Sequence, residues 1–118
     1  MEAFSVTEAL VSWLGSMGYE ASQDVPGDMP DEFVTVERTG GGVTSLVDHP
    51  VVAVQCWAMT PDRAEALATE ARLRMLTERP PAGVHSVRAN QGPYKFNDPA
   101  TRRPRWQFAL DVSCQLAI

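Results

Sequence analysis

Residues 105–116 read RWQFALDVSCQL, and apolar side chains occupy every second position of most of this stretch. One parity holds Trp106, Phe108, Leu110, Val112, Cys114 and Leu116. The other parity is mainly polar and holds Gln107, Asp111, Ser113 and Gln115. A period of two over this length predicts a β-strand that buries one face against a core.

A polar and basic segment, residues 91–104, precedes this strand. Its cationic residues are Lys95, Arg102 and Arg103, and Arg105 follows at the start of the strand. We expect a loop here, with Tyr94 near its entry. A long strand entered from a basic loop favours a subunit that contacts a neighbour over an enzyme folded around a pocket.

Two helices are predicted from apolar spacing and from their end signals. The first covers residues 5–17, begins at Ser5, which with Glu8 fits a capping box, and ends at Gly18, a residue that commonly closes helices. The second covers residues 60–77 and begins with Thr60 as a cap and Pro61 in the first turn. Its expected buried face consists of Ala64, Leu67, Ala68, Ala71 and Met75.

Three further strands are predicted, over residues 33–39, 51–58 and 83–90. The last of these should place Val84, Ser86 and Arg88 on one face, because side chains alternate along a strand. The segment 40–50 between the first two is long for a tight hairpin, so we expect a protruding arm. Its opening residues, Gly40, Gly41 and Gly42, are expected to form a flexible turn.

The order helix, strand, arm, strand, helix, strand, loop, strand predicts an α+β fold. It consists of one mostly antiparallel sheet of about four strands with two helices packed on one face. The chain has 118 residues, 44% of them hydrophobic, which fits a single domain, residues 1–118. No apolar run approaches a membrane span, and no signal-peptide pattern opens the chain, so we expect a cytoplasmic protein without membrane contact.

The net charge is −5, which argues against non-specific binding to nucleic acid. Residues 1–37 contain acidic residues and no Lys or Arg, whereas residues 79–105 are rich in Arg and contain one acid, Asp98. Two interpretations stay open. The charges mix on the folded surface, or they separate onto unlike faces through which identical copies associate head to tail.

No motif for catalysis, metal binding or cofactor binding stands out. The acids of residues 24–32 do not have the spacing of a calcium loop, and no Gly-Lys-Ser/Thr follows the three glycines. Cys56 and Cys114 lie on apolar parities, which predicts buried free thiols. A nucleophile pair of Cys56 with His49 or His85 is the one catalytic alternative left open. We expect no metal, no cofactor and no enzymatic activity.

Several stretches together resemble the tail terminator proteins, also called tail completion or neck proteins, of long-tailed bacteriophages. They are PDEFVTVERTGG at residues 30–41, VAVQCWA at 52–58, the alanine-rich helix after Thr60-Pro61, YKFNDP at 94–99 and PRWQF at 104–108. The resemblance covers most of the chain and rests on short sequence patterns, none of which is a catalytic motif.

This resemblance implies a homo-oligomeric ring, expected to be a hexamer, on the head-proximal end of the tail tube in the virion. The ring would be assembled in the cytoplasm of the host bacterium. It would end tube polymerisation, contact the tail tube protein and the head–tail connector protein, and let DNA pass without specific binding. The alternatives are a head–tail connector or stopper protein and a small non-viral cytoplasmic binding domain.

The residues expected at subunit and tube contacts come from both ends of the charge distribution and from the predicted arm. They are Asp28, Asp31, Glu32, Gly40, Gly41, Gly42, Tyr94, Lys95, Arg102, Arg103 and Arg105.

Overall fold

The alternating stretch near the C-terminus forms strand β5, Arg105–Cys114, in the computed structural model, which describes all residues 1–118. Phe108, Leu110, Val112 and Cys114 are buried on one face of β5, and Trp106 packs against the same core. The predicted alternation is therefore confirmed up to Cys114. Leu116 lies beyond the strand and is exposed, and its carbonyl oxygen accepts a hydrogen bond from the Phe4 amide near the N-terminus.

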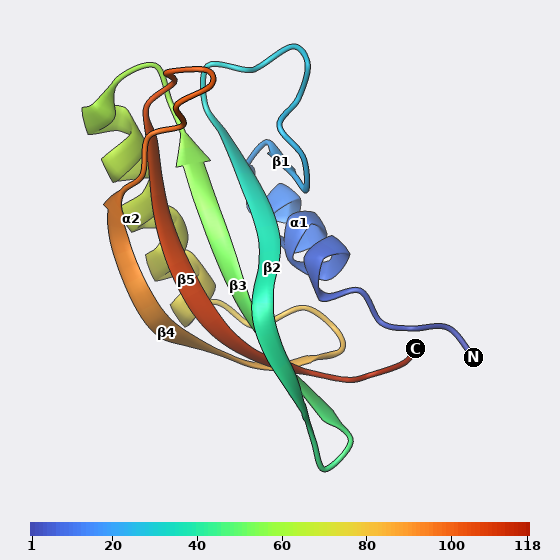
Figure 1. The fold of residues 1–118 in the computed structure, drawn as a ribbon. Coiled ribbons are helices and arrows are strands. Elements are labelled where there is room, and N and C mark those ends of the chain that lie inside the picture. Colours follow the sequence, from blue (N-terminus) through green and yellow to red (C-terminus); the bar gives the residue numbers. More distant parts are fainter.

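The sheet has five strands in the order β1-β2-β3-β5-β4 (Figure 1). The remaining strands are β1 Ala21–Ser22, β2 Phe33–Thr44, β3 Val47–Trp57 and β4 Val84–Lys95. All neighbours are antiparallel except β1 and β2, which are parallel. The α+β class is confirmed, but the strand count is five and not four. The additional strand β1 has only two residues, too few for a periodic signal in the sequence.

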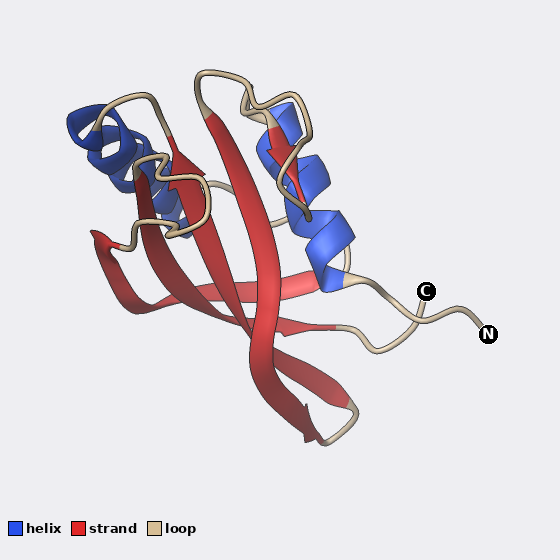
Figure 2. Cartoon of the chain, turned by 45° about the horizontal axis from the view of Figure 1, so that its top comes forward, coloured by secondary structure: helices blue, strands red, loops and turns tan.

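Both helices cover the same face of the sheet (Figure 2). Helix α1, Val6–Ser16, begins where the Ser5 hydroxyl accepts a hydrogen bond from the Glu8 amide. Helix α2, Pro61–Thr77, begins where the Thr60 hydroxyl accepts one from the Arg63 amide. These side chains satisfy amides that have no partner within the helix, so the predicted starts are confirmed.

The core lies between the two helices and this face of the sheet. The predicted face of α2 is buried throughout, from Ala64 to Met75. Its three buried alanines let the α2 backbone approach the sheet closely, and Leu10 and Leu14 of α1 complete the layer. The opposite face carries no helix, and we call it the helix-free face.

The connection between β2 and β3 differs from the prediction. Both strands continue beyond the body of the sheet, and a two-residue turn at Ser45 and Leu46 joins them. The three glycines therefore lie within β2 and do not form a flexible turn. The protruding arm itself is present, as a tight β-hairpin that projects past the rest of the molecule (Figure 1). We call residues 39–48 the hairpin arm.

Strand β4 is longer and less regular than predicted. It continues to Lys95, so Tyr94 belongs to the strand and the loop that we call the basic loop spans residues 96–104. A bulge between Val84 and Ser86 changes the parity of the strand. Val84 faces the core while Ser86 bonds Ser113 on the other face, so the prediction of a shared face is wrong.

Candidate functional site

The basic loop and the acidic segment before β2 meet at one end of the molecule. The Arg103 Nη1 donates a hydrogen bond of 2.8 Å to the carbonyl oxygen of Pro30, and its guanidinium lies 5.9 Å from the centre of the Phe33 ring. At this end the acidic and basic residues are neighbours.

Two of the three expected contact arginines are held within the chain. Arg103 makes the contacts just described, and Arg105 lies between the rings of Trp57 and Phe96, 4.9 and 4.5 Å from their centres. Arg105 also donates to the carbonyl oxygen of Phe96. Arg102 is different, since its exposed side chain makes no hydrogen bond or ion pair within the chain.

The acidic residues expected at contacts also fall into two groups, one bonded within the chain and one without an ion pair. Glu32 forms an ion pair with Arg63, with N···O distances of 2.7 and 2.9 Å. The hydrogen bonds from Arg63 lower the pKa of the Glu32 carboxyl below its ordinary value. Asp28 and Asp31 are exposed and make no ion pair. Arg102, Asp28 and Asp31 therefore stay available to a partner at this end, whereas Arg103, Arg105 and Glu32 are bonded within the chain.

A chain of side-chain hydrogen bonds crosses the helix-free face. Thr35 donates to Gln55 Oε1 over 2.8 Å, and Gln55 Nε2 donates to both Glu37 and Gln107, also over 2.8 Å. Gln107 Nε2 in turn donates to the Tyr94 hydroxyl. The chain links four neighbouring strands, β2, β3, β5 and β4.

Sequence reasoning selected only Tyr94 from this network. The missed signal is Gln55, a polar residue within the otherwise apolar run 51–58. It is 5% exposed, and a buried polar side chain needs hydrogen-bond partners. Lys95, the neighbour of Tyr94, is exposed at the end of β4.

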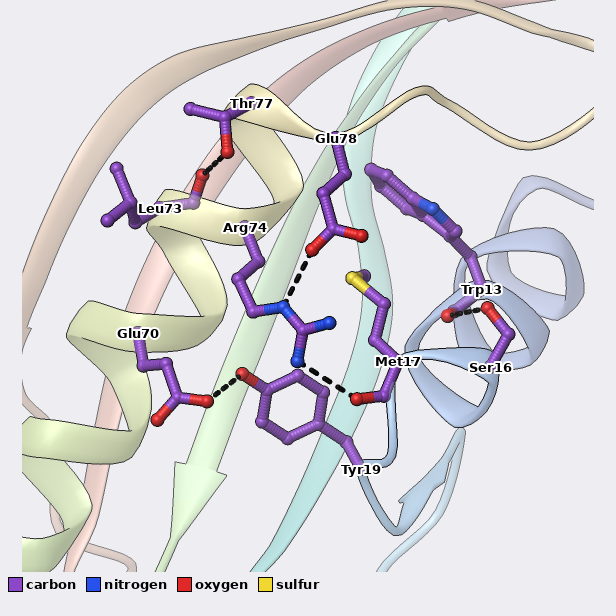
Figure 3. A network of polar contacts seen from close by, with 9 residues as sticks. All are labelled: Trp13, Ser16, Met17, Tyr19, Glu70, Leu73, Arg74, Thr77 and Glu78. Carbon is purple, nitrogen blue, oxygen red and sulfur yellow. Dashed lines mark hydrogen bonds and ion pairs between the residues drawn. The ribbon is translucent and has the colours of Figure 1, made fainter.

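A hollow of about 290 Å³ lies on the helix side, between the end of α1, β1 and the first half of α2. We call it the interhelix hollow; its lining includes Tyr19, Glu20, Glu32, Val34, Arg63, Leu67 and Glu70. Figure 3 shows Tyr19 between the two helices, where its hydroxyl donates to Glu70 over 2.7 Å. Arg74 donates to the Met17 carbonyl oxygen and ties the end of α1 to α2. Burial, followed by the bond to Glu70, raises the pKa of Tyr19 to about 12.

The hairpin arm shows why one of its glycines is required. Gly41 has a φ of +99°, and a Cβ atom there would lie 2.0 Å from the carbonyl oxygen of His49. Gly40 and Gly42 have no such restriction. At the tip, Ser45 and Leu46 have φ values of 52° and 63°, which non-glycine residues adopt at an energetic cost. Leu46 is 82% exposed, so no packing within the chain offsets this cost.

The catalytic alternative, a pair of Cys56 with His49 or His85, lacks an accessible thiol. Cys56 is fully buried, and burial raises the pKa of its thiol, which disfavours the reactive thiolate. Both cysteines are buried free thiols, as predicted. His49 lines a shallow hollow of about 410 Å³ with Ser86, Asp111 and Ser113, but its side chain bonds neither serine, and the two hydroxyls bond each other at 2.6 Å.

No group of three or more His, Cys, Asp or Glu side chains is placed to hold a metal ion. Neither helix has the length and apolar character needed to cross a membrane. No model of a known protein family matches the chain, and no curated protein matches it either.

Proposed function

We propose that this chain is a structural subunit of a phage tail, a tail terminator that forms a ring on the head-proximal end of the tail tube. The ring ends tube polymerisation and joins the tail to the head connector. The resemblance of residues 30–41, 52–58 and 94–108 to tail terminators supports the proposal. The fold is compatible with it, because the chain combines a small sheet with a projecting arm and loop.

The observation that carries the proposal is Leu46 at the tip of the hairpin arm. A large apolar side chain occupies a left-handed turn position and is 82% exposed. Asn or Gly would serve this turn at lower cost, since they tolerate positive φ. A residue that stabilises neither the turn nor the core is best explained by a contact outside the chain, and strained backbone is commonly found at such contacts.

The two ends of the molecule suit two different partners. The hairpin arm projects at one end, and the basic loop with Asp28, Asp31 and Arg102 lies at the other (Figure 1). A terminator needs this asymmetry, because one surface has to bind the tube while the other must not recruit another tube ring. We assign the arm to the tube contact and the exposed Asp28 and Asp31 of the charged end to the head connector.

The proposed function depends on binding to neighbouring subunits, the tail tube and the head connector, and it involves no chemical reaction. The net charge of −5 disfavours adhesion of DNA, which fits a channel through which DNA moves. We propose the virion neck as the location and a hexamer as the ring.

The test is electron microscopy of tail tubes polymerised from the tube protein of the same phage, with and without this chain. A terminator gives tubes of limited length with a cap on one end. Tubes of unchanged length without caps would contradict the proposal. Binding to the head connector without any effect on tube length would instead support the connector alternative.

A further inference from the structure

We propose that the interhelix hollow receives the Arg102 side chain of a second copy of this chain, in a head-to-tail contact. The inference rests on the proposed function, to which it adds the contact between neighbouring subunits of the ring. It also names the surface that the unpaired arginine of the basic loop recognises.

The interhelix hollow has the charge and the shape for a guanidinium group. Three carboxylates and one guanidinium line it, which gives a formal charge of −2. The one cation, Arg63, is already paired with Glu32. Glu20 makes no side-chain bond, and Tyr19 occupies only the Oε1 atom of Glu70, so carboxylate oxygens stay free for a further cation.

The apolar surface of the hollow is mainly the half-buried Tyr19 ring, with the buried side chains of Val34 and Leu67 beneath it. An arginine can lay its aliphatic stem along such a surface while its charged end meets carboxylates. Its planar guanidinium also bonds a carboxylate through two parallel N–H groups, which makes arginine the preferred cation for contacts that lose water.

The basic loop holds Arg102 ready for this contact. The Asp98 carboxylate accepts hydrogen bonds from the Ala100 amide and the Thr101 hydroxyl, and the Asp98 carbonyl oxygen accepts one from the Arg102 amide at 3.0 Å. Arg103 anchors the next position to Pro30. The loop is therefore fixed on both sides of Arg102, whose exposed side chain has no partner. A contact residue presented by an ordered loop loses less entropy on binding.

The positions of the hollow and the basic loop along the strands are compatible with closure into a ring. The hollow lies on the helix side at the start of β2 and includes Phe33 in its lining. The basic loop lies at the same end of the sheet, where Arg103 contacts the Phe33 ring, which stacks on Trp57 outside the helix-side core cluster. Two different patches at the same position along the strands can meet when neighbouring copies are related by rotation about an axis parallel to the strands. Such copies are not displaced along that axis. A head-to-tail contact of this kind forms a ring when its rotation divides a full turn, whereas a contact between the arm tip and the opposite end would produce a filament.

The test is sedimentation velocity of the full chain at low ionic strength, from micromolar concentrations to about 1 mM, where even weak contacts are populated. The wild type should associate, and salt should weaken the association because the contact is electrostatic. A wild type that is monomeric over this whole range would overturn the inference.

Charge reversal on either side should disrupt the contact. Arg102→Glu and Glu20→Arg should each raise the dissociation constant about 30-fold or more, as loss of an interfacial charge pair does. The matched controls are Arg79→Glu and Glu65→Arg, exposed residues outside the hollow and the basic loop, which should associate as the wild type does. Circular dichroism and thermal unfolding verify that each variant folds.

The two variants together identify a head-to-tail contact. Their equimolar mixture should regain association that neither variant shows alone, because the intact loop of one variant meets the intact hollow of the other, and the two reversed side chains also carry opposite charges. The double variant with Arg102→Glu and Glu20→Arg should regain association. Single variants that associate as the wild type does, or a double variant no better than either single, would overturn the inference.

This experiment contains no tube protein, so its outcome is separate from the proposed function. Rings that leave tube growth unchanged would contradict the tail terminator and keep the contact. Capping of tubes by a chain that never associates through Arg102 would contradict the contact and keep the terminator.

Discussion

Gln55 of β3 and Gln107 of β5 are joined across the helix-free face by a hydrogen bond of 2.8 Å from Gln55 Nε2 to Gln107 Oε1. Gln55 also donates to Glu37 and accepts from Thr35, so both donors and one acceptor position of its amide are used. This buried amide bonds side chains of both strands that flank β3. We infer that it fixes the alignment of the three strands.

Replacing Gln55 by Leu should lower the free energy of unfolding by about 1–3 kcal/mol, because the Thr35 hydroxyl and the Gln107 carbonyl oxygen lose buried partners. Urea unfolding followed by circular dichroism measures the change. The control is Gln91→Leu on an exposed position of β4, which should change stability by about 0.5 kcal/mol or less. Equal effects of the two substitutions would show that the network does not stabilise the sheet.

Gly41→Ala should destabilise the hairpin arm, because a Cβ atom at φ +99° would overlap the His49 carbonyl oxygen. We expect a loss of about 1–3 kcal/mol in the arm, the range for strained backbone. Amide hydrogen exchange of the arm residues reports the loss. Gly42→Ala is the matched control, since a Cβ atom there meets nothing within 4 Å. Unchanged exchange in the Gly41 variant would contradict the geometry of the arm.

The base of the arm should make stability depend on pH. The Arg38 guanidinium bonds Asp48 at 2.6 and 2.8 Å and holds the pKa of Asp48 below its ordinary value of 3.8. A carboxyl with a lowered pKa stabilises the fold above its ordinary pKa, and the contribution is lost as pH falls through the lowered value. The pair is partly exposed, so we expect about 1 kcal/mol or less.

Asp48→Asn isolates this contribution from those of other acids. The variant should be less stable than the wild type near neutral pH, and the difference should shrink as pH falls below 3.8 and vanish once Asp48 is protonated in both states. Thermal unfolding of both proteins across this range measures the difference. A difference that persists undiminished in acid would mean that packing and not charge is responsible.

Both thiols should be unreactive in the folded protein. Cys56 and Cys114 are fully buried, and burial raises the pKa of each. We expect slow labelling by a thiol reagent under native conditions and rapid labelling of both after denaturation. Rapid native labelling of Cys56 would reopen the catalytic alternative.

The sequence alone predicts the elements that carry a local signal. Strand β5 follows from its period of two, and both helices follow from Ser5 and Thr60 as caps and from their apolar faces. The hairpin turn could not be predicted in this way. Ser45 and Leu46 adopt positive φ without the Asn-Gly type of signal that identifies such turns.

The remaining differences come from tertiary structure. The bulge after Val84 reverses the parity of β4, and alternation in the sequence does not reveal a bulge. Charge counts along the chain did not predict that Arg103 reaches Pro30, or that Arg105 lies between two rings. The interhelix hollow depends on how α1 and α2 are spaced, so only the folded chain defines it.

A substitution at the arm tip should have opposite effects on the stability of the fold and on binding to the tail tube. Leu46→Asn should stabilise the fold by up to about 1 kcal/mol, because Asn tolerates the left-handed turn better than Leu. The same substitution should weaken the contact with the tail tube, since it removes the exposed apolar side chain. Thermal unfolding measures the first effect, and tube capping measures the second.

The most direct measurement of the central claim is the length distribution of tail tubes grown with the wild type and with Leu46→Asn, imaged by negative-stain electron microscopy. The wild type should give short tubes capped at one end, and the variant, although at least as stable, should leave longer tubes with fewer caps. Tubes that grow to the same length with the wild type as without it would contradict the assignment as a tail terminator.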